Sequence, residues 1–435
     1  MRIAVVGLGK IGLPLAVQYA SKGHEVLGVD IRPETVATVN AGQAPFPGEA
    51  DLQERLSDVV PSRLRATTEF AEAIPHSDAV VVVVPLFVDE SGVPDFSLMD
   101  AATRDIAANL TPGVLVSYET TLPVGSTRER WKPMLESGSG LQEGSDFQLV
   151  FSPERVLTGR VFADLRRYPK LFGALSPQGG RAAREFYEQV LDFDERPDLD
   201  APNGVWDLGT PEAAELAKLA ETTYRDVNIA LANQFARYAE SAGVDIFKVI
   251  AASNSQPYSH IHKPGISVGG HCIPVYPQLY LHTDPAASVV RTARAYNQGV
   301  PEHAAEMLEK CYGGLTGVRV AVLGAAYRGG VKETAFSGVF PLVDALRRRG
   351  AVVSVHDPLF DAAELGSLGL TPYQLGEQTD AAVLHTDHGA YAALGPQDLP
   401  GVRAIVDGRH LLDRQAFGDV RFVQLGNGEA TGGLA

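Results

Sequence analysis

Residues Met1–Gly12 read MRIAVVGLGKIG, an apolar, β-branched run that leads directly into a glycine-rich turn. The turn, Gly7-Leu8-Gly9-Lys10-Ile11-Gly12, has the GxGxxG spacing that joins a strand to a helix in dinucleotide-binding sheets. Glycines at these positions let backbone N–H groups and the helix N-terminus approach a pyrophosphate. Asp30 ends the next apolar run, 18 residues after Gly12, where its carboxylate can accept hydrogen bonds from ribose hydroxyls. The segment therefore predicts a Rossmann-like sheet that binds NAD.

The residues after the second strand bear on the choice between NAD and NADP. Asp30 would repel a 2′-phosphate, so the sequence favours NAD. Arg32, two residues later, could stack on adenine or pair with a phosphate, which leaves NADP open. The structural alternative is a tight glycine turn in which Asp30 only caps a helix.

The alternation of strands and helices continues along the chain and begins again near its end. Short β-branched runs separated by helix-like segments predict a parallel α/β sheet up to about Gly173. These runs are Ile3–Val6, Val26–Val29, Ala79–Val84, Leu115–Ser117 and Gln148–Phe151. A second series, which predicts a smaller sheet, consists of Arg319–Leu323, Val352–Val355, Ala381–Leu384 and Ala404–Val406.

One long helical segment separates the two series. From Pro211 to Glu240, apolar residues recur at helical spacing with no internal glycine or proline. Pro211 suits the start of a helix and Gly243 suits its end. The predicted fold is therefore α/β, with two Rossmann-like lobes joined by a long central helix.

Composition and charge exclude several classes of protein. The chain has 435 residues and a net charge of −16, which argues against a nucleic-acid or anionic-membrane surface. Its longest apolar run, Ala79–Val84, is too short to span a bilayer. The N-terminus lacks the layout of a signal peptide, and two cysteines 39 residues apart form no disulfide framework. We predict a cytoplasmic protein.

Cys272 lies in the loop Ser267-Val268-Gly269-Gly270-His271-Cys272-Ile273-Pro274, where neighbouring glycines leave the sulfur accessible. Cys311, flanked by helix-like sequence, is expected to be a small buried hydrophobe. The histidines His260, His262 and His271 raise a metal site as an alternative. We disfavour that alternative, because no further ligand pair has a suitable spacing, and we predict no metal.

Six segments of the chain carry a resemblance to a known family. They are GLGKIGLP (7–14), YETTLPVGST (118–127), FSPERVLTGR (151–160), ELAKLAETTYRDVNIALAN (215–233), HKPGISVGGHCIP (262–274) and VDGRH (406–410). In wording and order they resemble the UDP-glucose/GDP-mannose 6-dehydrogenases. The ERVL and GGHCIP wording is most similar to the UDP-N-acetylmannosamine and UDP-N-acetylglucosamine dehydrogenase branch.

The resemblance implies a four-electron oxidation of a sugar C6 alcohol to a carboxylate with NAD. Cys272 matches the nucleophile that forms a thiohemiacetal and then a thioester. Lys218 matches a lysine that stabilises the developing oxyanion, and Glu154 a carboxylate linked to water activation. Thr121 matches a hydroxyl that positions the reacting water. The structural alternatives are a solvated helix face for Lys218, a helix-start charge for Glu154 and a turn contact for Thr121.

Several positions depart from the family pattern. Tyr276 stands where the family has aspartate four residues after the nucleophile, and Thr222 replaces an asparagine four residues after Lys218. Thr158 aligns with a carboxylate that also varies within the branch. Two substrate-contacting arginines align with Tyr258 and Ala335. Since Cys272 and its predicted partners remain, we infer a site adapted to a different substrate or a shortened reaction.

Other residues can supply the missing substrate contacts. Arg328, Lys332 and Arg409 of the second lobe could replace phosphate-binding charge, and Lys263 could do so near the nucleophile loop. The predicted substrate-binding set consists of Thr222, Tyr258, Lys263, Gly269, Tyr276, Arg328, Lys332 and Arg409.

The sequence thus favours an NAD-dependent nucleotide-sugar 6-dehydrogenase that forms a homodimer through the long helix. We divide it into residues 1–200, an NAD-binding Rossmann domain, 201–312, a central helical domain with the nucleophile loop, and 313–435, a nucleotide-sugar-binding Rossmann-like domain. Two alternatives stay open. One is an enzyme that stops at a two-electron or transient oxidation, and the other is a non-catalytic sensor of NAD or a nucleotide sugar.

Overall fold

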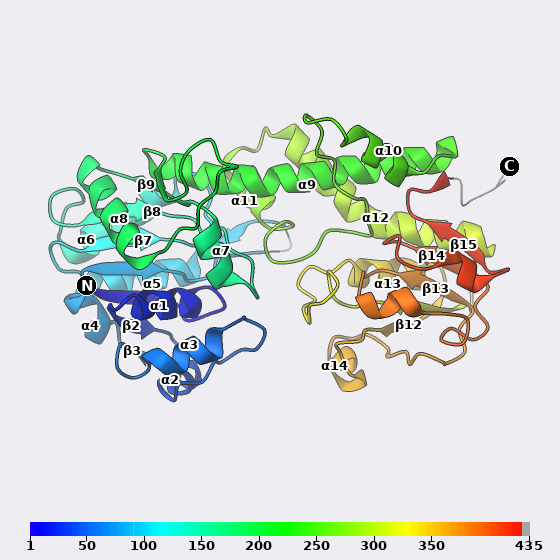
Figure 1. Ribbon diagram of the computed structural model, residues 1–435, viewed down its shortest axis with the longest axis horizontal. Coiled ribbons are helices and arrows are strands. Elements are labelled where there is room, and N and C mark those ends of the chain that lie inside the picture. The colour runs from blue at the N-terminus through cyan, green and yellow to red at the C-terminus, as the bar shows by residue number, and fades with distance from the viewer. Residues whose placement is uncertain (90, 429–435) are drawn as a thin grey trace. The chain divides into compact units, whose positions relative to one another are not determined.

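The computed structural model describes residues 1–89 and 91–428, and the chain divides into two compact units (Figure 1). Unit 1 comprises Met1–Glu221 and Gln278–Thr283, and unit 2 comprises Thr222–Pro277 and the chain from Asp284 onward. The boundary falls inside a single helix, α9 (Pro211–Ala242), so this helix contributes residues to both units. The three-part division of the sequence remains a proposal.

Unit 1 contains an eight-stranded sheet in the order β10-β9-β8-β7-β4-β1-β2-β3. The strands are β1 (Arg2–Val6), β2 (Glu25–Val29), β3 (Leu64–Thr67), β4 (Ala79–Val82), β7 (Leu115–Tyr118), β8 (Gln148–Phe151), β9 (Lys170–Ala174) and β10 (Val205–Asp207). The five predicted strands are confirmed as β1, β2, β4, β7 and β8, and they pair in parallel. One pair differs from the prediction, because β9 runs antiparallel to β8.

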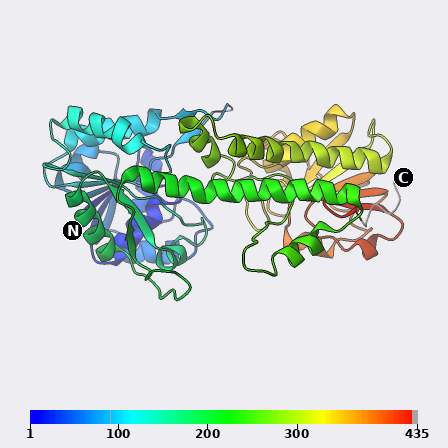
Figure 2. The ribbon, with the colours of Figure 1, turned by 90° about the horizontal axis from the view of Figure 1, so that it is seen from above.

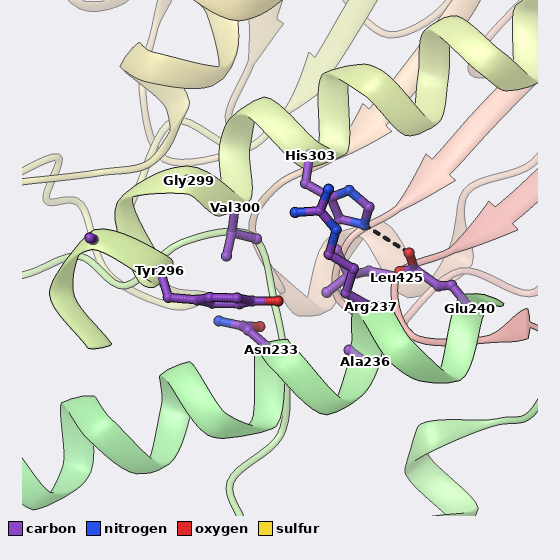
Figure 3. Close-up of a pocket in the computed structure, with 10 residues that line it drawn as sticks. Asn233, Ala236, Arg237, Glu240, Tyr296, Gly299, Val300, His303 and Leu425 are labelled. Carbon is purple, nitrogen blue, oxygen red and sulfur yellow. Dashed lines mark hydrogen bonds and ion pairs between the residues drawn. The ribbon is translucent and has the colours of Figure 1, made fainter. Parts of the chain in front are cut away.

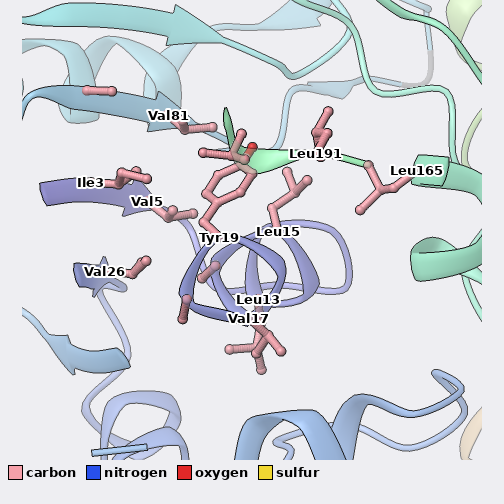
Figure 4. Close-up of a cluster of buried hydrophobic side chains, with 14 of the residues drawn as sticks. Ile3, Val5, Leu13, Leu15, Val17, Tyr19, Val26, Val81, Leu165 and Leu191 are labelled. Carbon is pink, nitrogen blue, oxygen red and sulfur yellow. The ribbon is translucent and has the colours of Figure 1, made fainter. Parts of the chain in front are cut away.

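The first helix packs against apolar side chains on one face of this sheet. Leu13, Leu15 and Tyr19 of α1 (Gly12–Ser21) are fully buried. Leu15 and Tyr19 lie on the side of the helix that faces Val5 of β1 and Val81 of β4, and Leu13 lies on the other side (Figure 4). The other helices of unit 1 are α2 (Pro33–Asn40), α3 (Leu52–Val59), α4 (Phe70–Ala73), α5 (Ser97–Asn109), α6 (Lys132–Ser139), α7 (Val161–Arg167) and α8 (Pro177–Val190). Burying α1 in this way fixes its N-terminus at the glycine turn.

Unit 2 contains a five-stranded parallel sheet in the order β12-β11-β13-β14-β15. Its strands are β11 (Arg319–Leu323), β12 (Val352–His356), β13 (Ala381–Leu384), β14 (Ala404–Asp407) and β15 (Arg421–Gln424). Its helices include α10 (Ile246–Ser253), α12 (Ser288–Tyr312), α13 (Val339–Arg348) and α14 (Ala362–Ser367), and α11 (Tyr276–Thr283) begins here. The predicted second, smaller sheet is confirmed, and β15 extends it.

In unit 2, α12 runs alongside the C-terminal half of α9 (Figure 2). The two helices are joined by a buried ion pair between Arg294 and Asp226, with 2.6 Å between Nε and Oδ2, and Asn297 donates to the same carboxylate. Neither these long helices nor any other in residues 1–89 and 91–428 has enough consecutive apolar residues to cross a membrane.

Candidate functional site

The glycine turn of unit 1 leaves no room for side chains at two of its three glycines. Gly7 has φ +96°, and a Cβ there would lie 2.9 Å from the carbonyl oxygen of Val83. A Cβ on Gly12 would lie 1.8 Å from the carbonyl oxygen of Gly7. Gly9 differs, because no described residue would come within 4 Å of its Cβ. Two glycines therefore shape the turn, and the third leaves open space at the start of α1, as pyrophosphate binding requires.

The other predicted cofactor residues surround this turn. Asp30 is buried, and its carboxylate accepts hydrogen bonds from the backbone N–H groups of Leu8 and Arg32, each at 3.0 Å. The Arg32 guanidinium lies 3.6 Å from the same carboxylate. Lys10 is exposed, whereas Ile11 packs against the core of the sheet. The open glycine and the strand-end carboxylate fit an adenine dinucleotide with an unsubstituted ribose.

A cluster of charged side chains lies where β7 and β8 end. Glu119 and Glu154 follow these strands, and the backbone N–H of Glu154 donates to the carbonyl of Glu119. Lys170, the first residue of β9, contacts both carboxylates with its ammonium group. Thr121, two residues after Glu119, is buried beside the same strand end. The structure thus places predicted Glu154 in an ion-pair network rather than at a solvated helix start.

Lys218 is part of the same region of unit 1. It is buried on α9, and its positive charge contributes to lowering the pKa of Lys170. One turn earlier on α9, buried Glu215 accepts hydrogen bonds from the backbone of Gly125 and from both the backbone and the hydroxyl of Thr127. These contacts tie α9 to the loop that follows Thr121, so Lys218 is not on a solvated helix face.

Sequence reasoning missed Glu119, Lys170 and Glu215. All three are charged residues in mainly apolar segments, and they are buried to 1%, 5% and 0% exposure. Charged side chains are almost never fully buried unless they are paired. A charge inside a short apolar run, as in Tyr168-Pro169-Lys170-Leu171-Phe172, is therefore a signal that could have found Lys170.

In unit 2, Cys272 is exposed on a loop whose backbone geometry requires glycine. A Cβ on Gly269 would lie 2.4 Å from the Cβ of Tyr327, and Gly270 has φ +92° against the ring of the same tyrosine. The carbonyl of Cys272 accepts hydrogen bonds from the N–H groups of Val275 and Tyr276, and the latter begins α11. Cys311 is buried as expected, and burial raises the pKa of its thiol.

Two contacts from the second sheet hold this loop. The Gly270 N–H donates to the carbonyl of Ala335 at 2.8 Å. Arg409 donates to the carbonyls of His385 and Ile266, at 2.5 and 3.0 Å, so its guanidinium clamps the chain just before the loop. Ala335, predicted from the sequence to stand in place of a family arginine, thus supports the loop of Cys272 through its backbone.

The remaining predicted substrate residues of unit 2 fall into different environments. Arg328 lies over the ring of Tyr327, next to the nucleophile loop, with 6.0 Å from its guanidinium carbon to the ring centre. Lys332 pairs with Glu364 and is half-exposed. Tyr258 is 92% exposed. Lys263 is exposed, Tyr276 is half-buried and Thr222 is buried on α9.

Two further features lie outside the predicted site. A pocket between α9 and α12 is lined by Asn233, Arg237, Glu240, Tyr296 and His303 (Figure 3). There His303 contacts Glu240, with 2.7 Å between Nε2 and Oε2. Within the part of the chain that the structure describes, no three histidine, cysteine, aspartate or glutamate side chains are grouped so as to hold a metal ion.

Comparison with protein families gives three consecutive matches. Residues 1–191 match the NAD binding domain of the UDP-glucose/GDP-mannose dehydrogenase family, residues 212–298 its central domain, and residues 321–414 its UDP binding domain. A UDP-N-acetyl-D-mannosamine dehydrogenase from Pyrococcus horikoshii is 35% identical, covering 99% of this chain and 100% of the relative. An NDP-N-acetyl-D-galactosaminuronic acid dehydrogenase from Ralstonia nicotianae is 32% identical, covering 94% and 95%.

Solved structures give the same result. The structure of a UDP-D-ManNAc dehydrogenase from Pyrococcus horikoshii superposes with a TM-score of 0.88 at 33% identity, covering 99% of this chain and 100% of that one. An NDP-N-acetyl-D-galactosaminuronic acid dehydrogenase from Methanosarcina mazei superposes with a TM-score of 0.85 at 26% identity, covering 100% and 97%. Both the fold and the resemblance stated from the sequence are confirmed.

Proposed function

This chain belongs to the UDP-glucose/GDP-mannose dehydrogenase family and is an NAD-dependent dehydrogenase of nucleotide sugars, and we propose that it oxidises the sugar C6 alcohol fully to a carboxylate. The observation that carries the proposal is the exposed thiol of Cys272 on a loop built around Gly269 and Gly270. An accessible cysteine can hold an aldehyde covalently until a second oxidation has taken place.

The groups of unit 1 serve the two oxidations. The glycine turn and Asp30 hold NAD, which accepts a hydride from C6 in each oxidation. The buried ammonium of Lys218 stabilises negative charge on the reacting oxygen, where burial strengthens the interaction. Overall, the alcohol, two NAD and one water give a carboxylate, two NADH and three protons.

Cys272 connects the two oxidations. Its sulfur adds to the aldehyde carbon to form a thiohemiacetal, and the carbonyl oxygen takes up a proton. Loss of a hydride and that proton gives a thioester. A water oxygen then attacks the thioester carbon, Glu154 takes the water proton, and the carbon–sulfur bond breaks to release the Cys272 thiolate. Thr121, two residues after Glu119, orients this water through its hydroxyl.

For the substrate, we propose UDP-N-acetyl-D-mannosamine or a close N-acetylhexosamine. Support comes from the relative named for that substrate, which is 35% identical along its whole length. The predicted adaptation concerns Tyr276 and Thr222, which stand where the family has aspartate and asparagine. A panel of UDP-, GDP- and dTDP-sugars with NAD, read by NADH absorbance and product mass, identifies the substrate. Arg328, Lys332, Arg409 and Lys263 are proposed contacts to its phosphates.

Replacing Cys272 with alanine tests the covalent step. We expect Cys272→Ala to abolish acid formation while NAD binding and the unfolding temperature stay unchanged, because the exposed thiol adds little to the core. Cys311→Ala is the matched control and should retain turnover. Acid formation by the Cys272 variant at a comparable rate would contradict the covalent mechanism, and tight binding of substrate by an inert wild type would favour a sensor.

We also propose a homodimer formed through α9. Leu231, Phe235 and Tyr238 follow one another at spacings of four and three residues, and are 41%, 38% and 73% exposed. Such an exposed apolar stripe with two aromatic residues on one helix face is typical of a protein interface. Sedimentation should show a dimer for the wild type and a monomer for Tyr238→Glu.

The cytoplasmic location remains a prediction.

A further inference from the structure

Lys170 lies between two carboxylates that no motif of the sequence connects to it. Strand β9 runs antiparallel to β8, with Val150 opposite Ala174 and Phe151 opposite Gly173. Continuing this register beyond the strand ends places Lys170 opposite Glu154. Because of the antiparallel pairing, the first residue of β9 lies at the edge where β7 and β8 end. This topology puts a buried ammonium next to the carboxylate proposed to activate water.

The contacts of Lys170 form an ordered chain. Its Nζ contacts Oε1 of Glu154 and lies 2.8 Å from Oε2 of Glu119. The other oxygen of Glu119 accepts a hydrogen bond from the Tyr187 hydroxyl at 2.6 Å. Since that hydroxyl donates to Glu119, the Ser117 hydroxyl, 2.7 Å away, must donate to Tyr187. The donor and the acceptor of each hydrogen bond from Ser117 to Lys170 are thus defined.

Burial strengthens the electrostatic interactions within this hydrogen-bonded network. Side chains of Lys170, Glu119 and Glu154 are 5%, 0% and 9% exposed, so water screens their interactions weakly. Lys170 also lies 4.9 Å from the centre of the Tyr187 ring. Burial lowers the pKa of Lys170 and the charge of Lys218 adds to that effect, whereas Glu119 opposes both. An ammonium in hydrogen-bond contact with a carboxylate favours the ionised form of that carboxylate.

We propose that Lys170 and Glu119 are positioning residues for Glu154, setting its charge and orientation for the hydrolysis of the thioester. This inference rests on the proposed function, in which Glu154 takes the proton of the attacking water. Lys170 engages Oε1 of Glu154 and leaves Oε2 to accept that proton. Glu119 shares the ammonium with Glu154, and this sharing keeps Glu154 basic enough to act.

The charged and titratable groups that contact Lys170 or act on its charge come from four parts of unit 1. They are Glu119 after β7, Glu154 after β8, Tyr187 on α8 and Lys218 on α9. The residue after Glu154, Arg155, is directed to Glu221 instead, with 3.2 Å between Nη2 and Oε1. Removing Lys170 therefore takes one positive charge from Glu154, and neutralising Glu119 takes one negative charge from its surroundings. The two changes must shift its titration in opposite directions.

The test compares Lys170→Met, Lys170→Arg and Glu119→Gln with the wild type in single turnovers on the sugar that the substrate panel identifies. For Lys170→Met we expect the first NADH to form at the wild-type rate, whereas acid release falls roughly 10- to 100-fold. The chain should then accumulate a covalent sugar adduct, detectable by intact mass. Lys170→Arg should restore much of the rate.

The pH profile of acid release separates positioning from loss of structure. The midpoint of its acidic limb, where Glu154 takes up a proton and stops acting as a base, should move up by about one unit in Lys170→Met and down in Glu119→Gln. Lys22→Met, which removes an exposed lysine paired with Asp192 in the same unit, is the control and should move neither. If Lys170→Met folds poorly, Glu119→Gln still decides the test, provided that its unfolding temperature equals that of the wild type.

The outcomes distinguish the inference from the proposed function. A wild type that releases acid and two NADH, with unshifted profiles in both variants, overturns the role of Lys170 and leaves the proposed function standing. Shifts in the same direction in both variants overturn it as well. A wild type that releases no acid from any sugar of the panel overturns both proposals together.

Discussion

The two Rossmann-like sheets are built alike around their central strands but differ in the loop that follows. In both, a glycine with positive φ ends the strand, Gly7 at +96° and Gly324 at +104°. In both, an aspartate after the neighbouring strand accepts backbone hydrogen bonds from that turn. The helix α1 begins at Gly12, immediately after the first turn, whereas α13 begins only at Val339.

Because the two loops differ in length, the two sheets are suited to different ligands. The short first turn leaves the N-terminus of α1 open to a pyrophosphate. The long second loop instead supports the nucleophile loop through Ala335 and carries Arg328 and Lys332. Its aspartate, Asp357, also pairs with His388, with 3.1 Å between Oδ2 and Nε2. A shared fold therefore says less about function than the loops grafted on it.

The largest effect is expected from replacing a glycine with alanine in each of the two turns, and NAD binding should distinguish the two variants. Gly12→Ala would place a Cβ 1.8 Å from the Gly7 carbonyl oxygen, and Gly324→Ala would place a Cβ 2.2 Å from the Cβ of Thr386. We expect each to reduce the free energy of unfolding by roughly 3 kcal/mol or more. NAD affinity, measured by fluorescence titration of the folded fraction, should fall only in Gly12→Ala. Equal loss in both variants would contradict the assignment of NAD to the first turn.

The next expected effect concerns buried acids with opposite pKa shifts. Burial raises the pKa of Glu215 in unit 1 to about 7. Burial also acts to raise the pKa of Asp357 in unit 2, but hydrogen bonds from His388 and the backbone outweigh it, and the pKa is lowered. Protonated Glu215 thus stabilises the fold below the pKa of an unfolded glutamate, and this contribution is lost as the pH rises toward 7.

Glu215→Gln tests that sign. Between pH 4.5 and 7 the wild type should lose roughly 3 kcal/mol of unfolding free energy that the glutamine variant does not lose. Urea unfolding across this range measures the difference. Asp357→Asn should instead remove a contribution that is present above the pKa of an unfolded aspartate and lost in acid. A steeper loss toward pH 7 in Glu215→Gln than in the wild type would refute the shift.

A moderate effect is expected at the strand-end aspartates. Asp30→Ala should weaken NAD binding by about 1.5–3 kcal/mol, typical of a charge-assisted hydrogen bond. The wild type should also prefer NAD to NADP, because the carboxylate repels a 2′-phosphate. Asp357→Ala should lower the unfolding temperature and leave NAD affinity unchanged. Equal or better kinetics with NADP would point to Arg32 as the dominant contact.

The smallest effect is expected at an exposed pair of the second loop. Lys332 contacts Glu364, and both side chains are about half exposed. If Lys332 binds substrate phosphate, Lys332→Ala should raise the KM for the nucleotide sugar by less than about fivefold, without changing the KM for NAD. Glu364→Gln frees the ammonium and should lower the KM slightly. An effect of Lys332→Ala on NAD alone would contradict its assignment.

Local patterns predicted most of the fold. Periodicity located the central strands and α9, because β-branched runs and helical spacing are properties of single segments. The antiparallel direction of β9 is not such a property, since it depends on the strand with which β9 pairs. For that reason the contact between Lys170 and Glu154 was not predicted from the sequence. The same holds for Glu215, whose partners Gly125 and Thr127 lie far away along the chain.

The residues of the candidate site were predictable to a different degree. The glycine turn and the Cys272 loop are contiguous and were found directly. Lys218, Glu154 and Thr121 came from a resemblance, and the structure adds that all three are buried or nearly so in unit 1. The substrate-binding residues depend on side chains from several loops. Arg409, predicted to bind phosphate, also clamps the backbone at Ile266.

The central claim is that the chain carries a nucleotide sugar through two oxidations, the second of them on an adduct with Cys272. The most direct measurement is the number of NADH formed per molecule of UDP-N-acetyl-D-mannosamine consumed, together with the mass of the product. Two NADH and a product heavier by one oxygen and lighter by two hydrogens are predicted. One NADH with an aldehyde product, or consumption of sugar without NADH, would contradict the claim.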